Sequence, residues 1–204
     1  MKPEKEIRAF SAELRVSRDA ENPIISGYAA VFNKLSEDLG GFREKIAPGA
    51  FAAALKTSDV RALINHDPNQ IVGRTGVNLT LKEDKEGLFM ELTPPPAGSV
   101  RFEQLAQDIE SGLITQQSFG FQVRTDEWTE DKKEVTRTLR EIERVFDVSP
   151  VTYPAYPDTS IAKRSLDEFK SAQTGGTENG QTTVGVEIEQ EQTANAIALM
   201  ENDK

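Results

Sequence analysis

The segment 117–149, "QSFGFQVRTDEWTEDKKEVTRTLREIERVFDVS", decides the fold of this chain. Its beginning, "QSFGFQV", alternates aromatic with small polar residues, which is typical of a strand that buries one face. The last part, "LREIERVFDVS" (139–149), also alternates, and the polar "WTEDKKEV" (128–135) between them is typical of a turn. The sequence therefore predicts one long β-hairpin over residues 116–149.

The two faces of the first predicted strand differ in chemistry. Phe119 and Phe121 share the face expected to pack in the core, whereas Ser118 and Gly120 share the opposite face. Gly120 has no Cβ, so a substrate backbone could approach the strand closely at that position. A small serine beside a glycine is also what the wet face of an ordinary strand carries, and both interpretations stay open.

The register of the hairpin brings acidic residues near this serine. A turn centred near residues 131–132 places Ser118 opposite Val145 on the returning strand. Glu143 and Asp147 then become diagonal neighbours of Ser118 on the same face, about 7 Å away. The sequence predicts a hydroxyl with two carboxylates beside it.

Shorter periodic runs elsewhere complete a mainly β chain with helices, of the α+β class. Alternating runs predict strands over 24–32, 60–66, 79–83 and 88–93. A helix is predicted over 48–56, and a second over 99–112, where Ser99 can cap the start and Gly112 can end the helix.

Composition excludes several kinds of protein and site. The 204 residues include no cysteine, which excludes disulfides, thiolate metal ligands and a cysteine nucleophile. The net charge of −10 disfavours nucleic acid as a partner. No apolar run is long enough for a signal peptide or a membrane span, so an intracellular protein with no membrane partner is expected.

The chain divides into one domain and a tail. Residues 1–170 have the size of a single domain, whereas 171–204 contain no aromatic residue and are rich in Gln, Thr, Asn, Gly and Glu. Such a segment buries too little apolar surface to offset the entropy of ordering it. We expect a flexible, polar, acidic tail.

His66 is the only histidine of the chain, in "LINHDPNQIVGRT" (63–75). With Ser118 and a nearby acid, it supplies the three parts of a Ser-His-acid system, in which the imidazole takes the serine proton and the acid orients the ring. By pattern alone, a lone histidine before "DPN" also fits a residue at a turn. Zinc would need more ligands than His66 and Asp67, so no metal or cofactor is expected.

Four motifs, in order from about Ile24 to Ser160, carry a family resemblance. They are "GYAAVFNKLSEDLGGFREKIAPGAFAAAL", "DVRALINHDPNQIVGRTGVNLTLKEDKEGL", "QSFGFQV" and "RTLREIERVFDVSPVTYPAYPDTS". The sequence resembles the phage prohead (procapsid) maturation protease family, which is similar in fold to the herpesvirus assemblins. That resemblance implies a closed β-barrel surrounded by a few helices.

The resemblance also implies roles for individual residues. The histidine of the family's "NHDP" motif falls on His66, and the serine of its "SFGF" motif falls on Ser118. The herpesvirus enzymes use a second histidine as third member, which this chain lacks, so an acid is implied, Asp147 or Glu143. No arginine stands where those enzymes have an arginine pair, and backbone N–H groups around residues 151–153 are the expected oxyanion donors.

The implied function is that of a serine endopeptidase inside the procapsid, in the cytoplasm of the bacterial host. It would cleave the scaffolding protein, or the scaffold-like segment of the major capsid protein, and then itself. The tail then fits a targeting signal or a self-cleavage segment, and a homodimer is an expected active form by analogy. The alternative is a non-catalytic assembly or scaffold module, which would have no need of His66 with Ser118.

Overall fold

The computed structural model describes residues 5–10, 14–19, 22–132, 134–153 and 159–174. Within these residues the strands are β1 (Glu6–Phe10), β2 (Arg15–Asp19), β3 (Asn22–Val31), β4 (Arg43–Ile46), β5 (Arg61–Ile64), β6 (Asp67–Arg74), β7 (Leu79–Glu83), β8 (Gly87–Leu92), β9 (Gln116–Asp131) and β10 (Glu134–Val151). The helices are α1 (Ala54–Thr57), α2 (Val100–Glu110) and α3 (Thr159–Thr174). The fold is mainly β with a few helices, which confirms the predicted α+β class.

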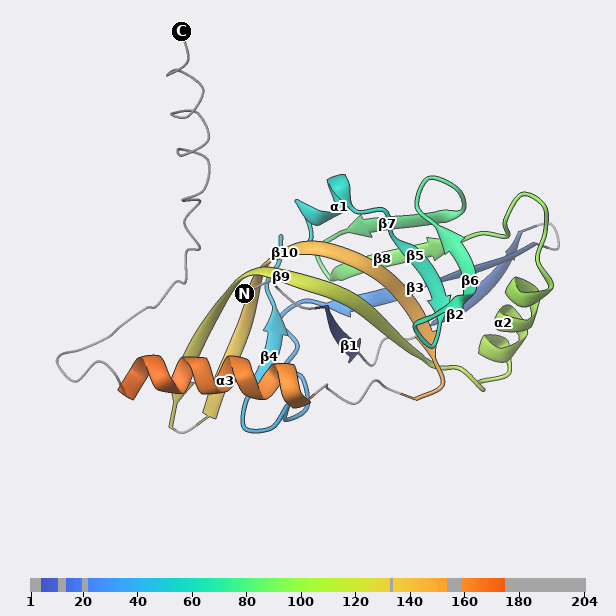
Figure 1. The fold of residues 1–204 in the computed structure, drawn as a ribbon. Coiled ribbons are helices and arrows are strands. Elements are labelled where there is room, and N and C mark those ends of the chain that lie inside the picture. Colours follow the sequence, from blue (N-terminus) through green and yellow to red (C-terminus); the bar gives the residue numbers. More distant parts are fainter. Residues whose placement is uncertain (1–4, 11–13, 20–21, 133, 154–158, 175–204) are drawn as a thin grey trace, which may run out of the picture.

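The strands pair into two sheets (Figure 1). The first has the order β1-β9-β10-β5-β6, with β4 pairing a further part of β10, and the second has the order β2-β3-β8-β7. The β9–β10 hairpin is the longest feature of the first sheet and brings β1 and β5 to its two outer edges. Pairing among the described strands keeps the sheets separate, so the closed barrel stays a prediction.

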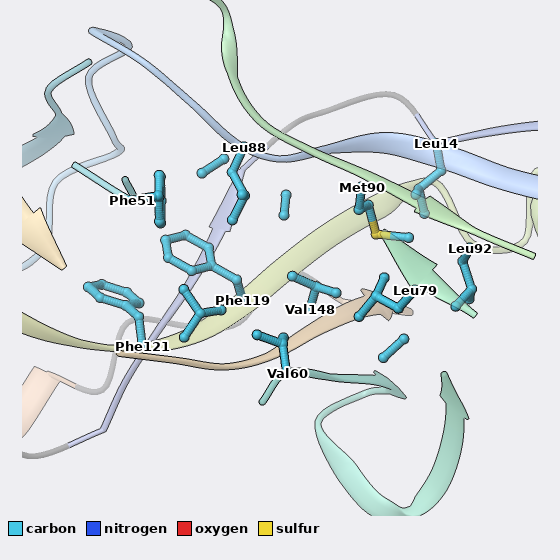
Figure 2. Close-up of a cluster of buried hydrophobic side chains, with 14 of the residues drawn as sticks. Leu14, Phe51, Val60, Leu79, Leu88, Met90, Leu92, Phe119, Phe121 and Val148 are labelled. Atoms are coloured by element: carbon cyan, nitrogen blue, oxygen red, sulfur yellow. The ribbon is translucent and has the colours of Figure 1, made fainter. Parts of the chain in front are cut away.

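The main core joins side chains of both sheets (Figure 2). Phe119 and Phe121 of β9 are fully buried with their ring centroids 4.5 Å apart, and they share this core with Leu88 and Met90 of β8. Burial of each such side chain stabilises the fold by roughly 1.5–3 kcal/mol. Because the aromatic face of β9 is committed to the core, Ser118 and Gly120 must point to the other face, as predicted.

Helix α2 confirms its predicted pattern and ends. Ser99 is the N-cap, and its side chain accepts a hydrogen bond from the Phe102 backbone N–H at 3.3 Å. Gly112 has a positive φ of 76°, as expected just after a helix. The side chains on the apolar stripe of the helix are buried: Phe102, Leu105, Ala106 and Ile109.

The other predicted helix, 48–56, is mostly a series of turns, and only its end forms α1. The backbone N–H groups of Gly49 and Phe51 donate to the Glu83 carboxylate at 2.6 and 2.9 Å. These bonds attach the segment to the end of β7, because the carboxylate satisfies N–H groups that a regular helix would leave without partners. The apolar spacing of this segment is real, and it buries Phe51 and Ala54 without a full helix.

The hairpin is confirmed, but its predicted register is wrong. It closes at the pair Asp131–Glu134, so the strands run nearly to the tip of the segment predicted as turn. Register shifts characteristic of β-bulges then interrupt β10 between residues 139 and 147. The result is that Ser118 pairs with Ser149, not with Val145. Bulges add residues to one strand, and regular alternation contains no sign of them.

Several elements were not predicted from the sequence: β1, β2, β4, β6 and α3. Helix α3 packs Leu166 and Phe169 against Phe42 and Trp128 in a second, smaller apolar cluster. It continues to Thr174, four residues past the predicted domain boundary, and the remainder of the predicted tail lies outside the described residues.

Candidate active site

His66 lies in the two-residue turn that joins β5 to β6. Ile64 pairs with Asp67 across the turn, and the two residues between them, Asn65 and His66, have φ values of +54° and +58°. Positive φ at both central residues is the geometry of a tight type I′ hairpin turn, which favours Asn or Gly. Such a conformation costs free energy for a histidine, so surrounding contacts must hold it in place.

Asn65 supplies those contacts by tying the turn to the end of β10. Its backbone N–H donates to the Pro150 carbonyl at 3.0 Å, and its side-chain amide donates to Thr152 Oγ1 at 3.2 Å. In return, the Thr152 backbone N–H donates to Asn65 Oδ1 at 2.9 Å. The imidazole is therefore fixed relative to β10. The Thr152 N–H, one of the predicted oxyanion donors, is engaged in this bond.

Ser118 lies on β9 between two neighbouring strands. It pairs with Ala9 of β1 on one side and with Ser149 of β10 on the other. Its Oγ lies 2.7 Å from His66 Nε2 and 2.9 Å from the Arg8 carbonyl oxygen, to which the hydroxyl can also donate. The serine is fully buried, whereas the His66 side chain keeps 13% of its surface exposed.

Asp147 lies on the far side of the imidazole from Ser118. Its Oδ1 forms a short hydrogen bond with His66 Nδ1 and accepts a second bond from Ser149 Oγ at 2.9 Å. Its Oδ2 pairs with Lys5 Nζ at 2.7 Å. Burial alone would raise the pKa of the Asp147 carboxyl, but hydrogen bonds from His66 and Lys5, together with their charges, hold it below its usual value. The carboxyl is therefore charged at neutral pH.

The structure does not bring Glu143, the other predicted acid, to this place. The Glu143 carboxylate pairs with Arg124 and its side chain is 40% exposed. Glu143 was predicted as an equal candidate because the predicted register paired Ser118 with Val145. Residues 143 and 147 lie at equal distances along the strand on either side of Val145. With Ser149 opposite Ser118, Asp147 is the diagonal neighbour and Glu143 lies further along β10.

Gly120 has a different use from the one predicted. A Cβ at this position would lie 2.4 Å from Lys5 Cε and 2.5 Å from Asp147 Oδ2. Side chains of the protein itself fill the space above the glycine, where a substrate backbone was expected. Its missing side chain makes room for the Asp147–Lys5 ion pair.

Three participants in this site were not predicted from the sequence: Lys5, Ser149 and Asn65. Lys5 precedes β1 in a charged stretch that has no periodic signal, and the role of Ser149 depends on a register that bulges change. Asn65 could have been found, because Asn readily adopts positive φ and the "NH" pair separates β5 from a run that forms β6. In the part of the chain that the structure describes, no group of three or more His, Cys, Asp or Glu side chains is arranged to hold a metal ion.

The hydrogen bonds run in one line from Ser118 through His66 to Asp147, an arrangement suited to moving a proton from the hydroxyl to the imidazole. Residues 10–172 match the family model described as Caudovirus prohead serine protease. The chain belongs to the prohead serine protease family. It is accordingly a serine protease of phage capsid maturation, as the resemblance implied.

One relative and one solved structure are also similar to this chain. The chain is 31% identical over 165 residues to the prohead protease of Enterobacteria phage HK97, an alignment that spans 78% of this chain and 68% of the relative. The capsid assembly protease of bacteriophage T4, gp21, aligns with a TM-score of 0.49 and 14% identity, over 76% of this chain and all of that structure. None of the helices in the described residues is long and apolar enough to cross a membrane.

Proposed function

We propose that this prohead protease cuts peptide bonds with Ser118 as nucleophile, His66 as general base and Asp147 as the orienting acid. The observation that carries the proposal is the continuous hydrogen-bonded line of these three side chains. Asp147 is preferred to Glu143 because its carboxylate contacts the imidazole, whereas Glu143 pairs with Arg124.

In this mechanism the Ser118 Oγ attacks the scissile carbonyl carbon as its proton passes to His66 Nε2. The imidazolium that forms is stabilised by Asp147 at Nδ1, and the same proton then leaves with the amine of the departing segment. A water molecule then attacks the acyl carbon as His66 takes its proton, and His66 returns that proton to Ser118 Oγ as the acyl group is released. Asp147 stays charged throughout and fixes the tautomer that leaves Nε2 free to accept.

The burial of Ser118 limits how a substrate can reach its hydroxyl. A substrate segment can reach Oγ only after part of the surrounding chain moves, because the residue has no exposed surface and its hydroxyl also lies against the Arg8 carbonyl.

The substrates and the place of action follow from family membership as proposals. The scaffolding protein or the scaffold-like segment of the major capsid protein is the proposed substrate, followed by the chain itself, inside the procapsid in the host cytoplasm. The tail from residue 171 is the proposed targeting or self-cleavage segment. The closed barrel and the homodimer belong with these proposals. β3 contacts both β9 and β1, a contact between the two sheets that barrel closure would require.

The test is cleavage of the major capsid protein encoded by the same phage. Wild type, Ser118→Ala and His66→Ala are each mixed with it, and intact-mass spectrometry follows both proteins. We expect fragments of the capsid protein with wild type alone, and their masses give the cleavage sites. Equal fragments from all three proteins would remove Ser118 and His66 from the mechanism. No fragments from any of the three would leave the non-catalytic assembly module as the better description.

A further inference from the structure

Lys5 contacts the active site from outside the segment that matches the family model, which begins at residue 10. Its ammonium lies 2.7 Å from Asp147 Oδ2, the carboxylate oxygen turned away from His66. We propose that Lys5 is a positioning residue of this protease, which orients Asp147 and sets the pH range in which His66 acts as a base. This inference rests on the proposed function of the three residues.

The carboxylate of Asp147 is held through both of its oxygens. Oδ1 takes the bonds from His66 and Ser149, and Oδ2 takes the Lys5 ammonium. Asp147 is almost wholly buried, with 2% of its side chain exposed, so without Lys5 one oxygen would lose its ionic partner in a poorly hydrated place. Gly120 leaves the space that the pair occupies. The ion pair is thus built into the sheet.

Lys5 is also held from its own side of the contact. It directly precedes β1, which pairs with β9 over residues 117–121. Two side chains of β1, Glu6 and Arg8, are buried in ion pairs with Glu44 and Arg137. Because β1 is anchored in this way, the ammonium is delivered to one place beside Asp147, although 39% of the Lys5 side chain is exposed.

The chemical consequence concerns the proton on His66. A positive charge next to Asp147 offsets part of the negative charge that would favour an imidazolium. Lys5 therefore widens the pH range of activity on its acidic side, at some loss of imidazolium stabilisation in the transition state.

The charged groups around His66 allow this effect to be isolated. Asp147 faces the ring directly, and Lys5 faces it through Asp147. Asp67, the next residue along the chain, accepts from Asn69. Arg61, the β5 neighbour of Asp147 in the sheet, pairs with Asp59.

The titration of His66 by nuclear magnetic resonance tests the inference without any substrate. His66 is the only histidine, so its ring signals are unambiguous. We compare wild type with Lys5→Met, which keeps the chain length and removes the charge, with Lys5→Arg, and with Lys82→Met as a control on the exposed surface of β7 in the second sheet. Thermal unfolding of each variant, measured alongside, shows whether it is folded.

The expected result is a titration midpoint that moves to higher pH in Lys5→Met, by about half a unit or more. Lys5→Arg should restore the wild-type midpoint, because guanidinium also pairs with carboxylates, and Lys82→Met should not change it. A folded Lys5→Met protein with the wild-type midpoint would overturn the inference.

Cleavage of the capsid protein over pH 5–9 separates this inference from the function on which it rests. We expect the acidic limb of the rate profile to move to higher pH in Lys5→Met, in step with the titration. If wild type and Lys5→Met have the same profile while Ser118→Ala is inactive, the inference fails and the proposed function stands. If Ser118→Ala cleaves as wild type does, the proposed function fails, and the inference fails with it.

Discussion

At the scale of single residues, Asp147 combines several constraints. It is buried, it accepts from the only histidine and from Ser149, and it pairs with Lys5. Asp147→Asn keeps the size of the side chain but offers an amide in place of the carboxylate, which disfavours the tautomer with a free Nε2. By comparison with known Ser-His-Asp enzymes, the rate of capsid-protein cleavage should fall by about 10⁴-fold.

Glu143→Gln is the matched control for Asp147→Asn, because both change an acid of β10 to its amide. Glu143 is part-exposed and pairs with Arg124, so we expect its variant to cleave at nearly the wild-type rate. Gel densitometry of the capsid-protein fragments against time gives both rates. If Glu143→Gln loses most activity while Asp147→Asn keeps it, the assignment of the acid is wrong.

Gly120→Ala tests whether the space above the glycine belongs to the ion pair. The new Cβ would overlap Lys5 Cε and Asp147 Oδ2, and Asp147 is the less able to move because it is buried. We expect a loss of stability of about 1–3 kcal/mol in denaturant unfolding and a displaced His66 ring signal. An unchanged ring signal with full activity would mean that the site tolerates the methyl group.

Some residues of the candidate site could be predicted from the sequence, and others could not. His66 and Ser118 stand in short motifs whose residues are adjacent in the chain, and the family resemblance predicted a catalytic role for both. The choice between Asp147 and Glu143 depended on register, which turn position and bulges determine together. Lys5 is 142 positions from Asp147 along the chain, and no local pattern announces a contact over that separation.

At the scale of elements, the β5–β6 turn is the part whose geometry most directly controls the site. Asn65→Gly keeps a residue that adopts positive φ easily but removes the side-chain bonds to Thr152. Asn65→Ala removes the same bonds and adds a conformational cost of about 1–2 kcal/mol. Both variants should cleave more slowly, because His66 is held less firmly. Asn65→Ala should lower the unfolding temperature more than Asn65→Gly does.

Steady cleavage rates and thermal melting distinguish these two contributions. If Asn65→Gly cleaves at the wild-type rate, the bonds to Thr152 do not position His66, and the turn conformation alone is sufficient. If the two variants melt at the same temperature, the positive φ carries little strain.

A network of ion pairs connects the four strands β1, β4, β9 and β10. Glu44 of β4 is fully buried and bonds with Arg8 of β1 and Arg137 of β10 at 2.9 and 3.0 Å, and Arg137 also reaches Asp126 of β9. Glu44→Gln leaves both guanidinium groups short of a partner, and breaking a buried pair from one side costs about 3–5 kcal/mol. Urea unfolding should show a loss of that size.

Glu110→Gln is the control for Glu44→Gln, since Glu110 pairs with Arg18 at the surface. Its free energy of unfolding should change little, because water screens exposed pairs. Similar losses for the two variants would show that burial does not distinguish these ion pairs. This network was beyond prediction from sequence, because β1 and β4 are short strands without a clear alternation and contact residues far away in the chain.

At the scale of the whole molecule, the site depends on elements from distant parts of the chain. Residues before β1, the β5–β6 turn, β9 and β10 each supply one side chain to the line from Lys5 to Ser118. The strand class and the long hairpin could be predicted because their periodicity is local. The strand order β1-β9-β10-β5-β6 could not be predicted, because the spacing of apolar residues does not indicate which strands pair with one another.

The global stability should respond to acid through Asp147. Its pKa is lower in the folded protein than the unfolded value of about 3.9. Its contribution is therefore fully present above the unfolded pKa and is lost as the pH falls below that value and through the folded pKa. The free energy of unfolding of wild type should therefore drop below about pH 4 more steeply than that of Asp147→Asn. The free energies of unfolding of both proteins are measured in urea at several pH values in this range. An equal dependence on pH in wild type and Asp147→Asn would contradict the assigned contribution of the ion pair.

The most direct test of the central claim is chemical labelling of a preparation that is actively cleaving its capsid protein. A fluorophosphonate, which reacts with activated serines, is added in excess, and peptide mass spectrometry locates the adduct while cleavage is followed in parallel. We predict a single adduct on Ser118 that accumulates at the rate at which cleavage stops, with none formed in His66→Ala. Cleavage that stops with the adduct on another serine, or that continues with Ser118 fully modified, would contradict the account.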